Sequence, residues 1–211
     1  MNKTWMIVLG VLGALFVLVV LPVLGSYNGL VTDREAVRGQ INNLQSQYQR
    51  RSDLVPQLVN TVKGSANFEQ ATLTQVVEAR AKATSVKIDA ANATPEQLQQ
   101  YQSAQGELSS ALSRLLVSVE AYPDIKSTAA FQDLMSQLEG TENRIQVARN
   151  DYGKTVQGYN AKIQRFPTNI TAALFGFTQF PYFSADSGAQ NAPKVDFGTF
   201  GNPQPQPAPA Q

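Results

Sequence analysis

The 211-residue chain contains no cysteine and no histidine, and these two absences exclude several kinds of site. Without them there is no thiol nucleophile, no disulfide, no imidazole base and no zinc site built from the usual nitrogen and sulfur ligands. Seventeen Lys and Arg residues against sixteen Asp and Glu residues give a net charge of +1, so the basic excess of nucleic-acid-binding domains is missing. We therefore expect no cofactor, no metal ion and no nucleic acid partner.

The most distinctive positive feature is an uncharged apolar run from Trp5 to Leu24. A bilayer core ~30 Å thick needs ~20 apolar residues at a rise of 1.5 Å each, and this run has that length. Trp5 and Tyr27 flank the run, where amphipathic rings favour the headgroup level. We predict that residues 1–27 form a single transmembrane anchor that contacts the lipid bilayer through residues 5–24.

A cleaved signal peptide is the alternative interpretation of this N-terminal run. Val23-x-Gly25 resembles a weak cleavage site, but the run is longer than an ordinary signal-peptide core and only Lys3 is basic before it. Counting Lys3 before the run and Arg34 and Arg38 after it, the positive-inside rule weakly favours a cytoplasmic body.

The residues from 28 to 166 repeat apolar side chains at helical spacing. The fold class we predict is all-α, a long antiparallel helical bundle of three to four main helices following the single N-terminal transmembrane helix. Strand signals are nearly absent, because no period-two run of β-branched residues and no Asn-Gly hairpin occurs. The predicted helices cover about 30–63, 67–87, 95–122 and 127–165.

Several local signals predict where these helices begin, break and end. Thr94-Pro95-Glu96-Gln97 has the form of a capping box with proline in the first turn. Pro56 predicts a kink or restart near Ser52–Val55, because it removes a backbone donor and crowds the preceding turn. Gly64 predicts the end of the first helix. Thr32–Glu35 also resembles a capping box, unless the helix runs straight out of the membrane.

The chain after Pro167 divides into an aromatic segment and a tail. We predict that residues 167–183 fold back and pack near the bundle base; the alternative is an exposed aromatic patch that meets lipid or another subunit. Residues 184–211 are predicted to be a disordered tail rich in Pro, Gln and Gly. The candidate membrane-proximal or interface aromatic residues are Phe175, Phe177, Phe180, Tyr182 and Phe183.

Charged residues embedded in the helical stripes form the other candidate site. Glu139 and Glu142 are i,i+3 neighbours and in principle form a carboxylate pair for acid–base chemistry. We favour a structural role, because Arg–carboxylate pairs between helices set their register and no phosphate loop, nucleophile elbow or metalloprotease motif accompanies them. We therefore expect no enzyme. The predicted inter-helix polar cluster comprises Arg50, Arg51, Asp53, Glu142, Arg144 and Arg149.

Three blocks of sequence resemble the bacterial LemA family. They are Tyr27–Val31 with Arg50–Gly64, then Ala121–Lys126, and then Leu138–Ile145 continuing to Phe166-Pro167. The resemblance spans roughly residues 27–183 and implies one N-terminal span followed by an all-α bundle in the bacterial envelope, often with a cytoplasmic body. It also implies no established enzymatic activity. The implied location is the bacterial inner membrane, crossed once.

The chain departs from the family pattern at two positions. Phe68 stands where members often have histidine, so metal binding through that histidine cannot apply here. Gly153 stands where members often have asparagine, and it should loosen the last helix by up to ~1 kcal/mol relative to alanine.

Two functions remain open on this evidence. The first is a non-enzymatic scaffold or assembly factor that works as a homo-oligomer or with an envelope protein partner. The second is a ligand-sensing helical bundle of a membrane receptor system.

Overall fold

The computed structural model describes residues 3–64 and 68–183, and every regular element within them is a helix. The all-α prediction is confirmed for this part of the chain. The predicted tail, residues 184–211, lies outside the described residues. The helices are α1 (Lys3–Lys63), α2 (Gln70–Ser85), α3 (Pro95–Val119), α4 (Pro123–Lys126), α5 (Ala129–Gln164) and α6 (Thr168–Phe175).

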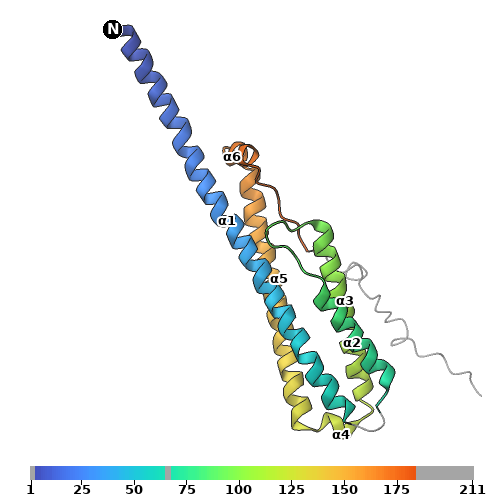
Figure 1. The fold of residues 1–211 in the computed structure, drawn as a ribbon. Coiled ribbons are helices and arrows are strands. Elements are labelled where there is room, and N and C mark those ends of the chain that lie inside the picture. The colour runs from blue at the N-terminus through green and yellow to red at the C-terminus, as the bar shows by residue number, and fades with distance from the viewer. Residues whose placement is uncertain (1–2, 65–67, 184–211) are drawn as a thin grey trace, which may run out of the picture.

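Four long helices run up and down to form the bundle (Figure 1). α1 pairs most closely with α5, and α2 pairs with α3. The short α4 lies at one end of the bundle, and α6 lies at the other end beside α1 (Figure 1). The 36 residues of α5 make it about 54 Å long at 1.5 Å per residue, so the bundle is a rod.

α1 passes through two different environments along one continuous helix. Its N-terminal part projects beyond the bundle, and Leu18 is 72% exposed there (Figure 1). From Leu30, which is 0% exposed, the same helix buries a stripe that continues to Val62. Among the described residues, α1 is the helix that is long and apolar enough to cross a membrane, with an 18-residue window of mean hydropathy 3.0 that is 0% buried.

α1 is uninterrupted at Pro56, so a restart near Ser52–Val55 is wrong, while the alternative of a kink there stays a prediction. Proline has no N–H, which leaves the carbonyl of Ser52, four residues earlier, without its helical donor. Arg80 of α2 supplies one instead, because its Nε donates to the Ser52 carbonyl at 2.8 Å. The neighbouring helix therefore satisfies the group that the proline frees, and α1 continues to Lys63.

The other helix ends follow their local signals closely. The capping box of α3 is confirmed, with the Thr94 hydroxyl accepting from the Gln97 amide at 3.2 Å. α1 ends at Lys63, directly before Gly64, as predicted. Thr32 does not cap a helix, because its hydroxyl donates to the Asn28 carbonyl within α1. The helix therefore runs straight through this position.

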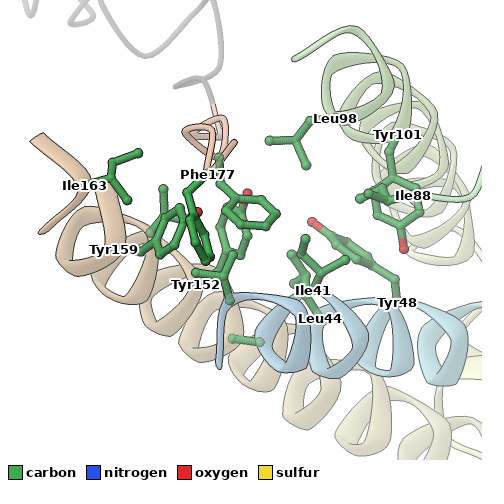
Figure 2. Close-up of a cluster of buried hydrophobic side chains, with 14 of the residues drawn as sticks. Ile41, Leu44, Tyr48, Ile88, Leu98, Tyr101, Tyr152, Tyr159, Ile163 and Phe177 are labelled. Carbon is green, nitrogen blue, oxygen red and sulfur yellow. The ribbon is translucent and has the colours of Figure 1, made fainter. Parts of the chain in front are cut away.

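The core consists of two clusters of buried apolar side chains, one toward each end of the rod. The cluster nearer α6 is rich in tyrosine. Figure 2 shows Tyr152 and Tyr159 of α5 beside Phe177, and Tyr48 of α1 beside Tyr101 of α3. The cluster nearer α4 is mainly aliphatic and includes Leu58, Leu108, Leu115 and Leu134.

Candidate functional site

A layer of buried polar side chains crosses the bundle between the two apolar clusters. Arg51 and Ser52 come from α1, Gln105 from α3 and Thr141 from α5, and each is 4% exposed or less. Buried polar groups in a helical core are costly unless they are hydrogen-bonded. The hydrogen bonds within this layer, called here the polar layer, therefore bear on the stability of the bundle.

Arg51 is the centre of the polar layer. Its Nη1 donates to Ser109 Oγ at 2.7 Å and to Glu142 Oε2 at 3.1 Å. Its Nη2 donates to the side-chain and backbone oxygens of Gln105 at 2.9 and 3.1 Å. The guanidinium also lies 5.0 Å from the ring centroid of Tyr48. One cation of α1 is thus bonded to α3 and to α5.

Gln105 extends the network to the fourth long helix. Its Nε2 donates to the carbonyl of Ala83 at 3.1 Å. Ala83 lies in the last turn of α2, where carbonyls have no intrahelical donor. Gln105 therefore accepts from Arg51 and caps α2 at the same time, so the polar layer fixes the relative register of all four long helices.

Of the six charged residues predicted to cluster, the structure brings only Arg51 and Glu142 together. Their side chains differ in exposure, at 4% for Arg51 and 59% for Glu142. Arg144 is exposed on α5, and Arg149 lies 5.5 Å from the ring of Phe183.

Arg50 and Asp53 lie on the outside of α1, where Asp53 accepts a hydrogen bond from Gln49 at 2.8 Å. Both residues line an open groove of about 600 Å³ together with Lys87 of the loop after α2. The sequence prediction of a single six-residue cluster is therefore corrected, because helical periodicity places these side chains on different faces.

Gln105 and Ser109 were not among the residues predicted from the sequence, although one signal for Gln105 is present. Gln105 occupies a position in the otherwise apolar stripe of α3, between Tyr101 and Leu108. A polar residue at such a position has to find a buried partner. Ser109 lies one turn further and carries no comparable signal.

Glu139 and Glu142, the two carboxylates considered for acid–base chemistry, do not face a common site. Glu142 is bonded to Arg51, whereas Glu139 lines a separate groove between α3 and α5 that also contains Glu120 and Lys126. In the described part of the chain, no group of three or more acidic side chains is arranged to hold a metal ion. Phe68, at the position often occupied by histidine, packs against Tyr122 with ring centroids 5.1 Å apart.

The segment after α6 folds back along the bundle. Asn160 of α5 accepts from the Phe180 amide at 3.0 Å and donates to the Phe180 carbonyl at 2.8 Å. The Tyr152 hydroxyl donates to the Pro181 carbonyl at 2.7 Å. Phe177 and Phe180 are buried, and Phe183 packs against the Tyr152 ring. These contacts hold the segment against α5.

The remaining aromatic residues of the predicted set are exposed. Tyr182 is 53% exposed and Phe175 is 48% exposed, although the Phe175 ring lies 4.8 Å from that of Tyr27 in α1. The predicted aromatic set thus divides into rings that fill the core and rings at the surface.

Burial raises the pKa of Tyr101 and of Tyr152 above the ordinary value of a tyrosine hydroxyl. The native state therefore keeps both phenols protonated, while the unfolded chain loses these protons as the pH passes about 10. The contribution of these two phenols to the free energy of unfolding is complete below pH 10. Above pH 10 it is lost, at up to about 1.4 kcal/mol per pH unit for each group.

We expect the free energy of unfolding to change little between about pH 6 and pH 9, where no histidine titrates, and to fall above pH 10. Urea unfolding followed by circular dichroism at each pH measures this. The variant Tyr101→Phe keeps the ring but not the titration, so its decline above pH 10 should be shallower. Equal slopes in the variant and the natural chain would contradict the assignment.

Comparison with known proteins gives consistent results. A model of the LemA family matches residues 40–197. Magnetosome protein MamQ 2 of Paramagnetospirillum magneticum is 28% identical over 178 residues, covering 74% of this chain and 64% of that protein. Magnetosome protein MamQ of Magnetospirillum gryphiswaldense is 26% identical with the same coverage. Protein LemA of Metamycoplasma hominis is 24% identical over 162 residues, covering 76% of this chain and 70% of that protein. The chain thus spans about 64% of the length of the MamQ proteins.

Proposed function

The chain belongs to the LemA family, and from that premise we propose that it is a membrane-anchored, non-enzymatic scaffold or assembly factor of the bacterial envelope. It acts through protein–protein contacts or self-association of its helical bundle. The observation that carries this proposal is α1, a helix of 61 residues that is apolar and exposed at one end and part of the core at the other.

The exposed apolar end of α1 supports a lipid environment. Its large apolar side chains from Trp5 to Val17, together with Leu18, Leu21 and Leu24, are about half exposed or more. A contiguous apolar surface of this size is unfavourable in water, at about 25 cal/mol per Å². Insertion into a bilayer removes it from water while the helix satisfies its own backbone hydrogen bonds.

The chemistry of the body supports the non-enzymatic part of the proposal. Arg51 and Glu142 are ion-paired to each other. Arg51 also donates to Gln105 of α3, which in turn donates to a carbonyl of α2, so these bonds connect α1, α3 and α2. Such groups hold helices in register rather than react with a substrate. The relatives are named magnetosome proteins or LemA, and neither name designates an enzyme.

Crosslinking in intact membranes tests the scaffold function. We expect a lysine-reactive crosslinker, applied at native expression levels, to capture a ladder of homo-oligomers or a defined envelope partner. Lys82, Lys126 and Lys154 are exposed on the bundle and available for this reaction. A chain that remains monomeric, with no partner captured, would contradict the proposal.

One end of the bundle carries an apolar stripe that faces outward. Phe166, Ile170 and Leu174, spaced four residues apart along α6 and its approach, are 80%, 56% and 71% exposed. α6 packs beside α1 just after the apolar segment, with Phe175 against Tyr27. An uncharged apolar helix in this position fits the boundary between headgroups and acyl chains. We propose that the α6 end of the rod rests on the bilayer surface.

A tryptophan placed at Leu174 reports on this contact. In a Trp5→Phe background, which removes the only natural tryptophan, Leu174→Trp should be strongly quenched by brominated phospholipids in proteoliposomes. Its emission should also shift to the blue, because the indole enters the interface.

Val117→Trp in the same background is the matched control. Val117 is 72% exposed, like Leu174, but lies on α3 toward the α4 end of the rod (Figure 1). We expect no quenching at this site. Equal quenching of both tryptophans, or of neither, would overturn the proposed placement of α6.

The cytoplasmic body and the single pass through the inner membrane are also part of the proposal. Lys3 precedes the apolar segment and Arg34 and Arg38 follow it, a charge distribution that favours a cytoplasmic bundle. Protease protection of spheroplasts distinguishes the two sides, because a cytoplasmic body is cleaved only after lysis.

A further inference from the structure

A small cavity lies between α1, the loop before α3 and the segment after α6, away from the polar layer. Its volume is about 290 Å³. α1 contributes Arg34 and Arg38, α5 contributes Tyr159, and residues 91–94 and 176–180 complete the wall. Figure 2 shows Tyr159 beside Phe177, which also lines the cavity.

Three of the side chains that line this cavity carry a buried donor without a protein partner. Within the described residues, the Nε atoms of Arg34 and Arg38 and the hydroxyl of Tyr159 make no hydrogen bond. Tyr159 is only 2% exposed. Because a buried polar group without a hydrogen-bond partner destabilises the fold, three of them around one cavity call for an acceptor.

The charges around the cavity favour an anionic acceptor. Arg38 is ion-paired to Glu35 and donates to the Ala91 carbonyl at 3.2 Å. Arg34 lies further from Glu35, with 4.0 Å between Nε and Oε1, and stacks 4.9 Å from the Phe177 ring centroid. The charged side chains that line the cavity are Arg34 and Arg38, whereas the carboxylates of Glu35, Asp33 and Asp89 lie near it without lining it. Asp33 is ion-paired to Lys162 at 2.7 Å, and Arg34 has no hydrogen-bonded partner of its own in the described residues.

Arg34 and Arg38 also act on the Tyr159 hydroxyl. Burial raises the pKa of Tyr159, the two guanidinium charges oppose that rise, and the Asp33 carboxylate adds to it. The fields of both arginines therefore reach the hydroxyl.

We propose that this cavity binds a small oxyanion, a phosphate or carboxylate group, through Arg34, Arg38 and Tyr159. Guanidinium groups are the preferred partners of such anions, and a protonated tyrosine hydroxyl adds a neutral donor. The volume is at the lower limit for ligand sites, so the group that enters is small. The site goes beyond the scaffold function, since a bound anion would join α1, α5 and the segment after α6.

The oxyanion has two sources that the structure makes accessible: a free anion in solution, and the phosphate of a lipid headgroup. Arg34 follows Leu24 by ten residues, about 15 Å along α1, so the cavity lies on the membrane-facing half of the rod. The two sources are separated by experiment below.

The test uses the full chain in maltoside micelles, which contain no phosphate. Inorganic phosphate or acetate is titrated against sodium chloride at matched ionic strength, and hydrogen exchange is followed in peptides covering residues 88–97 and 176–183. We expect saturable protection of both segments, with exchange at least threefold slower. A second arm places the chain in phosphatidylglycerol nanodiscs without added anion; protection there identifies the lipid headgroup as the source.

Arg34→Gln and Tyr159→Phe should each weaken the apparent affinity at least tenfold in whichever arm shows protection. Arg144→Gln, the same charge change at an exposed site on α5, should bind like the natural chain. Melting of each variant without anion checks that it is folded. No protection in either arm, or protection that Arg34→Gln and Arg144→Gln reduce equally, would overturn the proposal and leave water as the acceptor.

Discussion

Deleting residues 5–24 is expected to move the chain from the membrane pellet to the soluble fraction. The segment contains fourteen Leu, Ile, Val and Phe residues, which favour membrane insertion by about 0.3–0.6 kcal/mol each, or about 4–8 kcal/mol together. None of the buried core residues lies in it, because the core begins at Leu30. The deletion should therefore leave the melting of the bundle unchanged. Ultracentrifugation after alkaline carbonate extraction and thermal melting of the soluble product measure both expectations.

A replacement variant provides the control for this deletion. Substituting residues 5–24 by an unrelated segment of leucine and alanine should keep the chain in the carbonate-resistant pellet, because length and hydrophobicity determine insertion. The α6 stripe alone should give at most weak binding that carbonate removes. Mass spectrometry of the natural chain adds a second check. A mature chain that begins near Gly25 would show a cleaved signal peptide and refute the anchor.

Replacing Arg51 by alanine should give the largest loss of stability of any single substitution in the polar layer. The change removes a side chain that is 4% exposed, leaves a void and removes the donor to the buried side-chain oxygen of Gln105. Each buried group left unsatisfied costs about 1–3 kcal/mol, and the void adds to this. We expect a loss of about 3–5 kcal/mol in the free energy of unfolding, measured by urea titration.

Three further variants distinguish loss of the hydrogen-bond network from loss of a positive charge as the cause of the destabilisation. Arg144→Ala, at an exposed site on the same bundle, should change stability by less than about 0.5 kcal/mol. Glu142→Ala should cost about 1 kcal/mol or less, because Glu142 is 59% exposed. Arg51→Met combined with Gln105→Leu should recover only part of the loss, since the Ala83 carbonyl loses its donor. If Arg51→Ala and Arg144→Ala prove equally mild, the polar layer does not stabilise the bundle.

The helices could be predicted from the sequence because their signals are local. Apolar side chains at spacings of three and four residues indicate a buried helical face, and the Thr94 capping box marks the start of α3. The effect of Pro56 could not be predicted, because the donor that satisfies the Ser52 carbonyl comes from Arg80, in another helix. The group that Pro56 frees is thus satisfied by a tertiary contact, which local rules do not show.

The site was less predictable for the same reason. The sequence shows which residues are charged, but the pairing of Arg51 with Glu142 rather than with nearby Asp53 depends on how α1 and α5 face each other. The outward stripe of Phe166, Ile170 and Leu174 has helical spacing and was predictable in principle. The contact that holds α6 beside α1, between the rings of Phe175 and Tyr27, was not.

The continuity of α1 has a mechanical consequence. α1 continues as one helix from its lipid-facing segment, across Pro22, to the far end of the rod, so a tilt of the span that the helix transmits as a rigid body moves its distal end. The arm from Leu24 to Lys63 is about 58 Å long at 1.5 Å per residue. A change of 10° in the angle of the span, which thinning or thickening of the surrounding lipid can impose, would swing the distal tip by about 10 Å.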